Sequence, residues 1–262
     1  MKLKSYIKQQ GFSLVELAIV LVILGFVLGA LLLPLRAQRD QAAQIQTQNT
    51  LELAKQALLG FAQANGRLPC PALAGSGVAA PNASGPCTQQ VGFLPATTLG
   101  LQPVNAQGFA IDAWNNPIRY AVTQSDVNIT TGVATLNPVF TTSNGVNNAG
   151  IANLSQSANL RVCASSSTFS TTCSAPPISG ENNYLVNNAV AVIFSTGQTE
   201  ALEANTLPAI VRPDETENLD TDTVFVSRDI STAAAPNEFD HLVTWISPYV
   251  LYNAMIQAGQ LH

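Results

Sequence analysis

The sequence predicts an α+β protein with one long N-terminal helix followed by a β-rich head with long loops. Three observations predict this fold class. Residues 12 to about 64 contain one proline and no cluster of turn-forming residues before Asn65-Gly66, which favours one continuous helix. Prolines and glycines then crowd residues 67 to about 110, and short β-prone runs recur from about residue 117 onward. Such runs between Asn-, Gly-, Ser- and Thr-rich segments are typical of β-strands.

The first part of the helix is strongly apolar. A single carboxylate, Glu16, precedes 19 residues without charge, from Leu17 to Leu35. A helix of this length, rising about 1.5 Å per residue, can cross the roughly 30 Å hydrocarbon core of a membrane. A carboxylate just inside such a span is costly unless a partner neutralises it. The run therefore predicts a membrane helix in which Glu16 needs a partner.

The residues before this run form a recognisable leader. A short basic segment ends in GFSLVE, residues 11–16, and this pattern resembles the signal peptide of type IV prepilins and type II secretion pseudopilins. The resemblance implies cleavage between Gly11 and Phe12 by a prepilin peptidase, with N-methylation of Phe12. It also implies that Glu16 pairs with the N-terminal amine of an adjacent subunit during assembly. The alternative interpretation is an ordinary signal anchor that happens to contain a glutamate.

A second resemblance lies in the head. Residues 112–120, DAWNNPIRY, are similar to the turn that leads into the first sheet strand of pseudopilins. Asn-Asn-Pro favours a turn, and Trp114 and Tyr120 bring large apolar surfaces to the start of a strand. Together the two resemblances imply a pilin-like fold. In that fold a long helix, transmembrane in one half and amphipathic in the other, packs on a C-terminal antiparallel β-sheet head.

The expected organisation has four parts: a leader at 1–11, a transmembrane and assembly helix at 12–35, an amphipathic continuation at 36–66, and an exported head at 67–262. Leu51, Ala54, Leu58 and Phe61 repeat at helical spacing, which predicts an apolar stripe that packs on a sheet. Asn65-Gly66 predicts a left-handed helix end. Strands are expected at 117–123, 159–163, 189–196, 223–227 and 242–246, and a short helix at 248–258.

The charge distribution limits the partners of the head. From Leu68 onward there are four arginines against thirteen acidic residues. So acidic a domain repels polyphosphate, which disfavours nucleic acid as a partner. Lys2, Lys4 and Lys8 precede the apolar run, while Arg36 and Arg39 follow it. The charge bias toward a cytoplasmic N-terminus is therefore modest.

All four cysteines lie beyond the apolar run, on the side expected to be exported. An even number of cysteines in an oxidising compartment predicts two disulfides. Three pairings are open, and the favoured one is Cys70 with Cys87 and Cys163 with Cys173, because each pair flanks a loop rich in small and turn-forming residues. A zinc site is disfavoured because no Cys-x-x-Cys pair occurs and the two histidines are remote in sequence.

The sequence offers little for catalysis, and no enzymatic activity is expected. It contains no Gly-x-Ser-x-Gly elbow, phosphate-binding loop or His-Glu-x-x-His motif. His241 directly follows Asp240, which suits a solvated turn. The acidic run from Asp214 to Asp222 is interpreted mainly as a solvated loop. Its alternative is a calcium site with Asp220 and Asp222 as candidate ligands; no other cofactor is expected.

These observations favour a structural, minor subunit of a type IV pilus or type II secretion pseudopilus. Its expected partners are other pilin or pseudopilin subunits, the prepilin peptidase and an inner-membrane assembly platform. Its expected location is the inner membrane, as a single-pass protein with a cytoplasmic N-terminus and a periplasmic head, and then the fibre. The alternatives are a fibre-tip adhesin or uptake receptor on the same anchor, and an anchored protein that never assembles.

Overall fold

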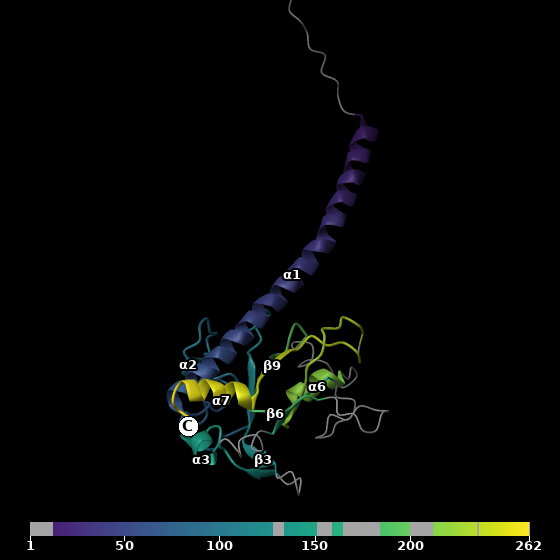
Figure 1. The fold of residues 1–262 in the computed structure, drawn as a ribbon. Coiled ribbons are helices and arrows are strands. Elements are labelled where there is room, and N and C mark those ends of the chain that lie inside the picture. The colour runs from purple at the N-terminus through teal and green to yellow at the C-terminus, as the bar shows by residue number, and fades with distance from the viewer. Residues whose placement is uncertain are drawn as a thin grey trace, which may run out of the picture. The chain divides into compact units, whose positions relative to one another are not determined.

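The computed structural model describes residues 13–127, 134–150, 159–164, 184–199, 212–234 and 236–261, except for the side chains of 30–37, 125–127 and 134–135 (Figure 1). The chain divides into two compact units, residues 1–45 and 46–262. Helix α1, Leu14–Asn65, belongs to both units. The continuous helix predicted over residues 12 to about 64 is therefore confirmed for the described residues. Among these, no helix combines the length and apolarity needed to cross a membrane, so the span predicted at 12–35 stays a prediction.

The C-terminal part of α1 contributes to the main core of the head. Leu51, Ala54 and Leu58 are buried, as the predicted stripe requires. The stripe continues through Ala62, whereas Phe61 is only half-buried and lies under the guanidinium of Arg67. The predicted helix end is confirmed: Gly66 has a φ of 64°, and its N–H donates to the carbonyl of Ala62.

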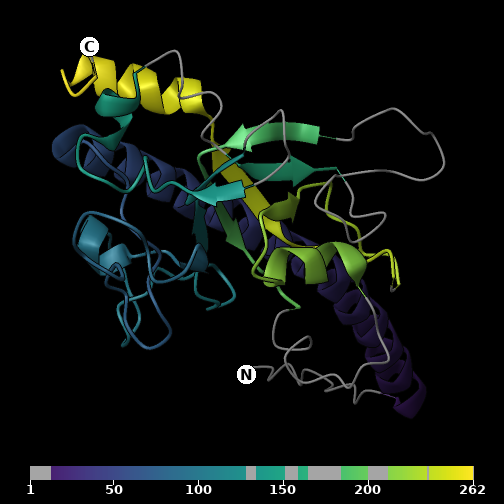
Figure 2. The same ribbon diagram turned by 90° about the horizontal axis from the view of Figure 1, so that it is seen from below.

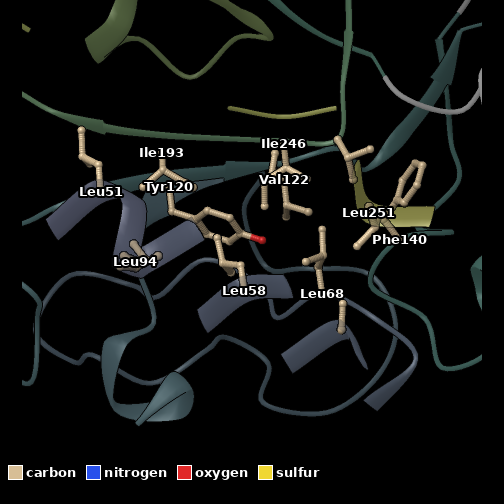
Figure 3. Packing of buried hydrophobic residues seen from close by; sticks show 14 of the residues in the cluster. Leu51, Leu58, Leu68, Leu94, Tyr120, Val122, Phe140, Ile193, Ile246 and Leu251 are labelled. Atoms are coloured by element: carbon tan, nitrogen blue, oxygen red, sulfur yellow. The ribbon is translucent and has the colours of Figure 1, made fainter. Parts of the chain in front are cut away.

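The larger sheet has four antiparallel strands in the order β1-β2-β7-β9, which are Val91–Phe93, Arg119–Val122, Ala191–Ser195 and Leu242–Ile246. One face of this sheet packs on α1, and Figure 3 shows the ring of Tyr120 beside Leu58. The hydroxyl of Tyr120 donates to the carbonyl of Pro69 at 3.1 Å. This bond satisfies the one polar atom that the ring brings into the core.

A second sheet covers the opposite face. It has the order β6-β5-β8, formed by Tyr184–Ala189, Leu160–Cys163 and Val224–Val226. Phe225 of this sheet packs against Phe194 of the larger sheet, with ring centroids 5.7 Å apart. The predicted antiparallel arrangement is confirmed for the larger sheet, and among the described strand pairs β5 with β8 is the one parallel exception. A parallel pair needs a long connection between its strands, and β6, β7 and α6 lie between β5 and β8 in the chain.

The remaining elements are short. Ser125–Val127 and Ala134–Leu136 pair as β3 and β4, and the short helices are α2 (Ala96–Leu99), α3 (Gly145–Ala149), α6 (Pro213–Leu219) and α7 (Pro248–Gln257). The hydroxyl of Ser247 accepts the N–H of Val250 and begins α7, which confirms the helix predicted at 248–258. Gln63 of α1 donates to the carbonyl of Ala254, joining the two helices. Figures 1 and 2 show α6 and α7 on opposite sides of the head.

All five predicted strands are present, as β2, β5, β7, β8 and β9. The sequence did not predict β1, β3, β4, β6 or α6. β1 has only three residues and lies in the proline-rich connector, where turn-forming residues dominate the local pattern. β6 contains two consecutive asparagines, a residue type that is depleted in strands. Pairing with neighbouring strands determines both elements.

One predicted disulfide is present, between Cys70 and Cys87. It closes a loop within the connector between α1 and the larger sheet, where the chain contains few regular elements. In the chain-entropy model, a loop of this length contributes about 3 kcal/mol by restricting the unfolded chain. Cys163 is also disulfide-bonded, while Cys173 lies outside the described residues.

Candidate functional site

The start of α1 carries the residues that the leader pattern singled out. Gly11 and Phe12 lie outside the described residues, and Glu16 lies in the first turn of the helix. The side chain of Glu16 is exposed, and its backbone N–H donates to the hydroxyl of Ser13 at 3.4 Å. Among the described residues no cation pairs with this carboxylate. Glu16 is thus available to a charged group outside its own chain.

The helix surface around Glu16 is apolar and uncovered. Its large side chains from Leu14 to Leu28 are exposed, and Phe26 retains 78% of its accessible surface. Exposed apolar side chains gain free energy when another apolar surface covers them, by about 25 cal/mol per Å². A contiguous apolar stretch of this kind is typical of an interaction surface.

The second sequence signature forms a tightly bonded turn. One carboxylate oxygen of Asp112 accepts the N–H groups of Trp114 and Asn116, at 2.9 and 2.8 Å. Its other oxygen accepts the hydroxyl of Ser195 in β7, at 2.6 Å. Asn115 adopts a φ of 71°, which asparagine tolerates better than most residues. Asp112 therefore fixes the entry to β2 against the neighbouring strand.

The same turn is joined to α1 and to the end of β7. The hydroxyl of Thr47, buried on α1, accepts the N–H of Ala113 at 3.1 Å. The side-chain amide of Asn116 donates to the carbonyl of Gly197. Gly197 has a φ of 67°, and a Cβ there would lie 2.5 Å from the carbonyl oxygen of Asp240. The turn at residues 112–116 therefore joins α1, the start of β2 and the end of β7. The hydroxyl of Ser195 contributes to this junction through its hydrogen bond to Asp112.

Helix α6 corrects the interpretation of the acidic run as a solvated loop. Asp214, Glu215 and Glu217 lie on this helix and are buried. Pro213 at its first position and acidic residues in its first turn are favourable there, because proline fits a helix start and carboxylates complement the helix dipole. The carboxylates in and around this helix include two groups, one with an arginine partner and one without.

The first group contains Glu215 and Arg212. The guanidinium of Arg212 lies 3.5 Å from Glu215 and 2.7 Å from Glu238. The other oxygen of Glu215 accepts the N–H of Asp240 at 2.9 Å. Burial, followed by the charge of Glu215, raises the pKa of Asp240 to about 6.

His241 also belongs to this first group and is buried, so the prediction of a solvated turn is wrong. Its ring stacks on Phe194, and its Nδ1 lies 3.1 Å from the amide nitrogen of Asn218. The amide oxygen of Asn218 accepts the N–H of Val226, so the amide nitrogen faces the ring and Nδ1 accepts. Burial, with the charges of Arg119 and Arg212, lowers the pKa of His241 to about 3.

These contacts argue against a metal ion at Glu215, Asp240 and His241, although their candidate ligand atoms lie within 4.8 Å of one another. A neutral imidazole has one lone pair for a metal, and the lone pair of Nδ1 already accepts from Asn218. The nearby guanidinium of Arg212 would also repel a cation. This group is a structural cluster held by hydrogen bonds and ion pairs.

The second group contains Glu217, Asp220 and Asp222, with a carboxylate oxygen of each within 4.8 Å of the others. The structure thus brings together both calcium candidates of the sequence, Asp220 and Asp222, and adds Glu217. Asp220 is exposed and Asp222 is half-buried. Burial, then the charges of Asp222, Asp220 and Asp214, raises the pKa of Glu217 to about 7. Burial and the charge of Asp220 also raise the pKa of Asp222.

Comparison with known proteins gives one finding. A family model described as the prokaryotic N-terminal methylation motif matches residues 7–32. The chain therefore carries the signal motif of type IV pilins and pseudopilins. Comparisons with curated proteins and with solved structures give no match.

The match includes Gly11, Phe12 and Glu16, the residues on which the sequence resemblance rests. It supports a type IV pilin-like or pseudopilin precursor that is membrane-anchored and processed, and it implies other pilin subunits and a prepilin peptidase as partners. It also points to a structural protein.

Sequence reasoning missed the burial of α6, the bond between Asp112 and Ser195, and the role of Glu217. Arg212-Pro213 followed by acidic residues is a helix-start pattern and could have indicated α6. The other two features join residues far apart in the chain, and no local pattern indicates them.

Proposed function

We propose that the chain is the precursor of a structural subunit of a type IV pilus or type II secretion pseudopilus. Prepilin peptidase cuts it between Gly11 and Phe12, Phe12 is N-methylated, and the mature helix enters the fibre. The observation that carries the proposal is the methylation motif at residues 7–32. The exposed Glu16 and the uncovered apolar surface of α1 from Leu14 to Leu28 support it.

In this proposal, the subunit waits in the inner membrane with its N-terminus in the cytoplasm and its head in the periplasm. An assembly platform then moves it into the fibre. The apolar surface of the helix can leave the lipid at little cost only if neighbouring helices cover it. The charge of Glu16 is balanced in the fibre when the N-terminal amine of a neighbouring subunit pairs with it. The mature chain of 251 residues is large for the principal subunit of a fibre, which favours a minor, low-copy subunit.

Processing is tested by expressing the full chain with and without a prepilin peptidase and measuring the mass of the N-terminal peptide. We expect a mature chain that begins with N-methylated Phe12. Gly11→Leu should block cleavage because a bulky residue cannot replace the glycine, whereas the matched variant Gly11→Ala should still be cut. An uncut chain, or a cut near residue 30, contradicts the proposal.

Assembly is tested by the ratio of the subunit in sheared fibres to that in inner membranes. Glu16→Ala and Glu16→Gln should both lower this ratio severalfold, because either leaves the partner amine without a counter-charge. Glu52→Gln is the matched control, since Glu52 is an exposed carboxylate on the same helix. An unchanged ratio for both Glu16 variants means that this residue has no assembly role.

A fibre-tip adhesin on the same anchor is the second candidate. The disulfide-closed connector at 67–110 favours it, because long loops on a stable scaffold are common binding elements. Immunogold labelling separates the two functions: labels confined to fibre ends favour the tip, and labels along the shaft favour a structural subunit.

A further inference from the structure

Two edge strands of the head are covered by other parts of the same chain. In β1, the first strand of the larger sheet, Phe93 exchanges two backbone hydrogen bonds with Ala72 of the connector, at 2.8 and 3.0 Å. In β8, at one edge of the second sheet, the side chain of Asn218 accepts the N–H of Val226 and donates to its carbonyl. Edge strands present unpaired backbone groups, and proteins usually cover or protect them.

The other edge of the larger sheet, β9, differs from these two. The carbonyl of Ile246 accepts the N–H of Val190, the residue before β7, so the backbone groups of Ile246 face β7. The bonding groups of an antiparallel strand alternate between its two sides, and those of Val243 and Trp245 therefore face away from β7. Among the described residues, no backbone or side-chain group bonds to the outward N–H and C=O groups of these two residues.

The residue types in β9 leave this edge unprotected. Its sequence, LVTWI, contains no charged residue and no proline, which are the usual devices that keep a further strand away from an edge. Most of its residues are of types that are enriched in strands. Val243, Thr244 and Trp245 are only half-buried, so another chain can approach. β9 therefore has the backbone chemistry and the access that strand addition requires.

The shortness of the open edge limits the kind of partner that can use it. Two outward-facing residues offer two N–H donors and two C=O acceptors. So few bonds do not offset the freedom that a separate molecule loses on association. A partner already tethered beside the head loses much less, because its binding is effectively intramolecular. Neighbouring subunits of a fibre, joined by their N-terminal helices, are tethered in this way.

Charge also favours the head of another subunit as the partner. From Leu68 onward the chain carries thirteen acidic residues against four arginines, so two such heads repel each other over much of their surface. Residues 242–262, which include β9, contain no aspartate or glutamate. A second acidic head meets less repulsion at β9 than along the acidic run from Asp214 to Asp222.

We propose that β9 is a contact strand between heads in the fibre, and that Val243 and Trp245 pair with an extended segment of the neighbouring subunit's head. The inference rests on the proposed function and names a second contact for it, separate from the contacts of the N-terminal helices. Pairing adds a strand to the larger sheet beyond β9. It satisfies the outward backbone groups and covers the half-buried side chains of the strand.

The first test compares two substitutions at Val243 in the full chain. Val243→Pro removes the outward N–H but no bond to β7, and an edge strand tolerates proline where its N–H faces outward. Val243→Ala keeps the N–H and is the matched control. We expect the ratio of the subunit in sheared fibres to that in inner membranes to fall severalfold for Val243→Pro, and to stay close to the wild-type ratio for Val243→Ala. Thermal unfolding in detergent checks that both variants are folded.

The second test needs no substitution and decides the question if Val243→Pro does not fold. Amide hydrogen exchange, read by mass spectrometry on peptides that cover residues 242–246, is compared between the wild type in detergent and the wild type in fibres. The amides of Val243 and Trp245 should exchange rapidly in detergent and be protected in fibres. The amides that face β7 should be protected in both states.

The outcomes separate this inference from the proposed function. Absence of the wild type from fibres contradicts both. If the wild type enters fibres but the amides of Val243 and Trp245 exchange equally fast in both states, only the pairing of β9 is overturned. Protection of these amides already in detergent also overturns it, because the edge is then paired before assembly. Equal fibre ratios for folded Val243→Pro and Val243→Ala lead to the same conclusion.

Discussion

The two ends of α1 contain similar apolar residues but differ in what covers them. In residues 14–28 the large apolar side chains are exposed, and Leu24 retains 50% of its accessible surface. In the part that belongs to the head, Leu58 retains none. Both positions are leucines on one helix. The burial of a helical residue therefore depends on the partner surface available to it.

The partner of the second part lies within the same chain. Tyr120 of the larger sheet lies against Leu58 (Figure 3), and both belong to the main core, so this part of α1 contributes to folding the head. In the proposed function, the first part is covered by lipid and then by neighbouring helices. In that proposal one helix serves folding at one end and assembly at the other, and substitutions in both parts of α1 test this division.

The largest effect is expected in the packed part. Leu58→Ala should lower the free energy of unfolding of the head by about 2–5 kcal/mol, because it removes buried methyl groups and leaves a cavity. Leu24→Ala, the matched change in the exposed part, should alter it by less than about 0.5 kcal/mol. Denaturant unfolding of the full chain in detergent measures both. Equal losses for the two variants would contradict the division.

The second prediction concerns the contribution of a single histidine to the stability of the head in acid. The pKa of His241 is lowered to about 3 in the folded head, whereas an unfolded histidine titrates near 6.5. Between these values only the unfolded chain binds the proton, so stability is lost as the pH falls, by about 1.4 kcal/mol per pH unit.

His241→Gln should remove this contribution, since glutamine does not titrate. The difference between the two proteins must be measured, because Asp240 and Glu217 act in the opposite direction: their pKa values are raised to about 6 and about 7, so their protonation favours the folded state as the pH falls. Denaturant unfolding at several pH values between 4 and 6 gives the slopes. Parallel pH dependences would exclude His241 as the source.

The smallest loss of stability is expected at Thr47, near the start of the packed part of α1. Thr47→Val should cost about 1 kcal/mol, because the N–H of Ala113 loses its acceptor at the junction around Asp112. Thr50→Val is the matched control, since the hydroxyl of Thr50 bonds only to the carbonyl of Gln46 within the same helix. The same unfolding curves measure both variants. If Thr50→Val lowers the free energy of unfolding more than Thr47→Val does, the packed part of α1 begins further along the helix than Thr47.

Local patterns predicted much of the fold. Helical spacing predicted the buried Leu51, Ala54 and Leu58, and Ser247-Pro248 predicted the start of α7. Such patterns succeed because helix ends and amphipathic faces depend on residues within a few positions of one another. The same reasoning failed for His241, because residues that surround it, Phe194 of β7 and Asn218 of α6, lie far from it in the chain.

By itself, the sequence determined the leader motif, the long helix and the strand-rich head. Each depends on residue types in fixed local order. Only the tertiary structure decided that β5 pairs in parallel with β8, that Asp112 bonds to Ser195, and that Glu217 is buried among carboxylates while Glu215 pairs with Arg212. The physical reason is that burial and charge pairing depend on which segments meet in space. Two glutamates two residues apart on a short helix can therefore have opposite electrostatic surroundings.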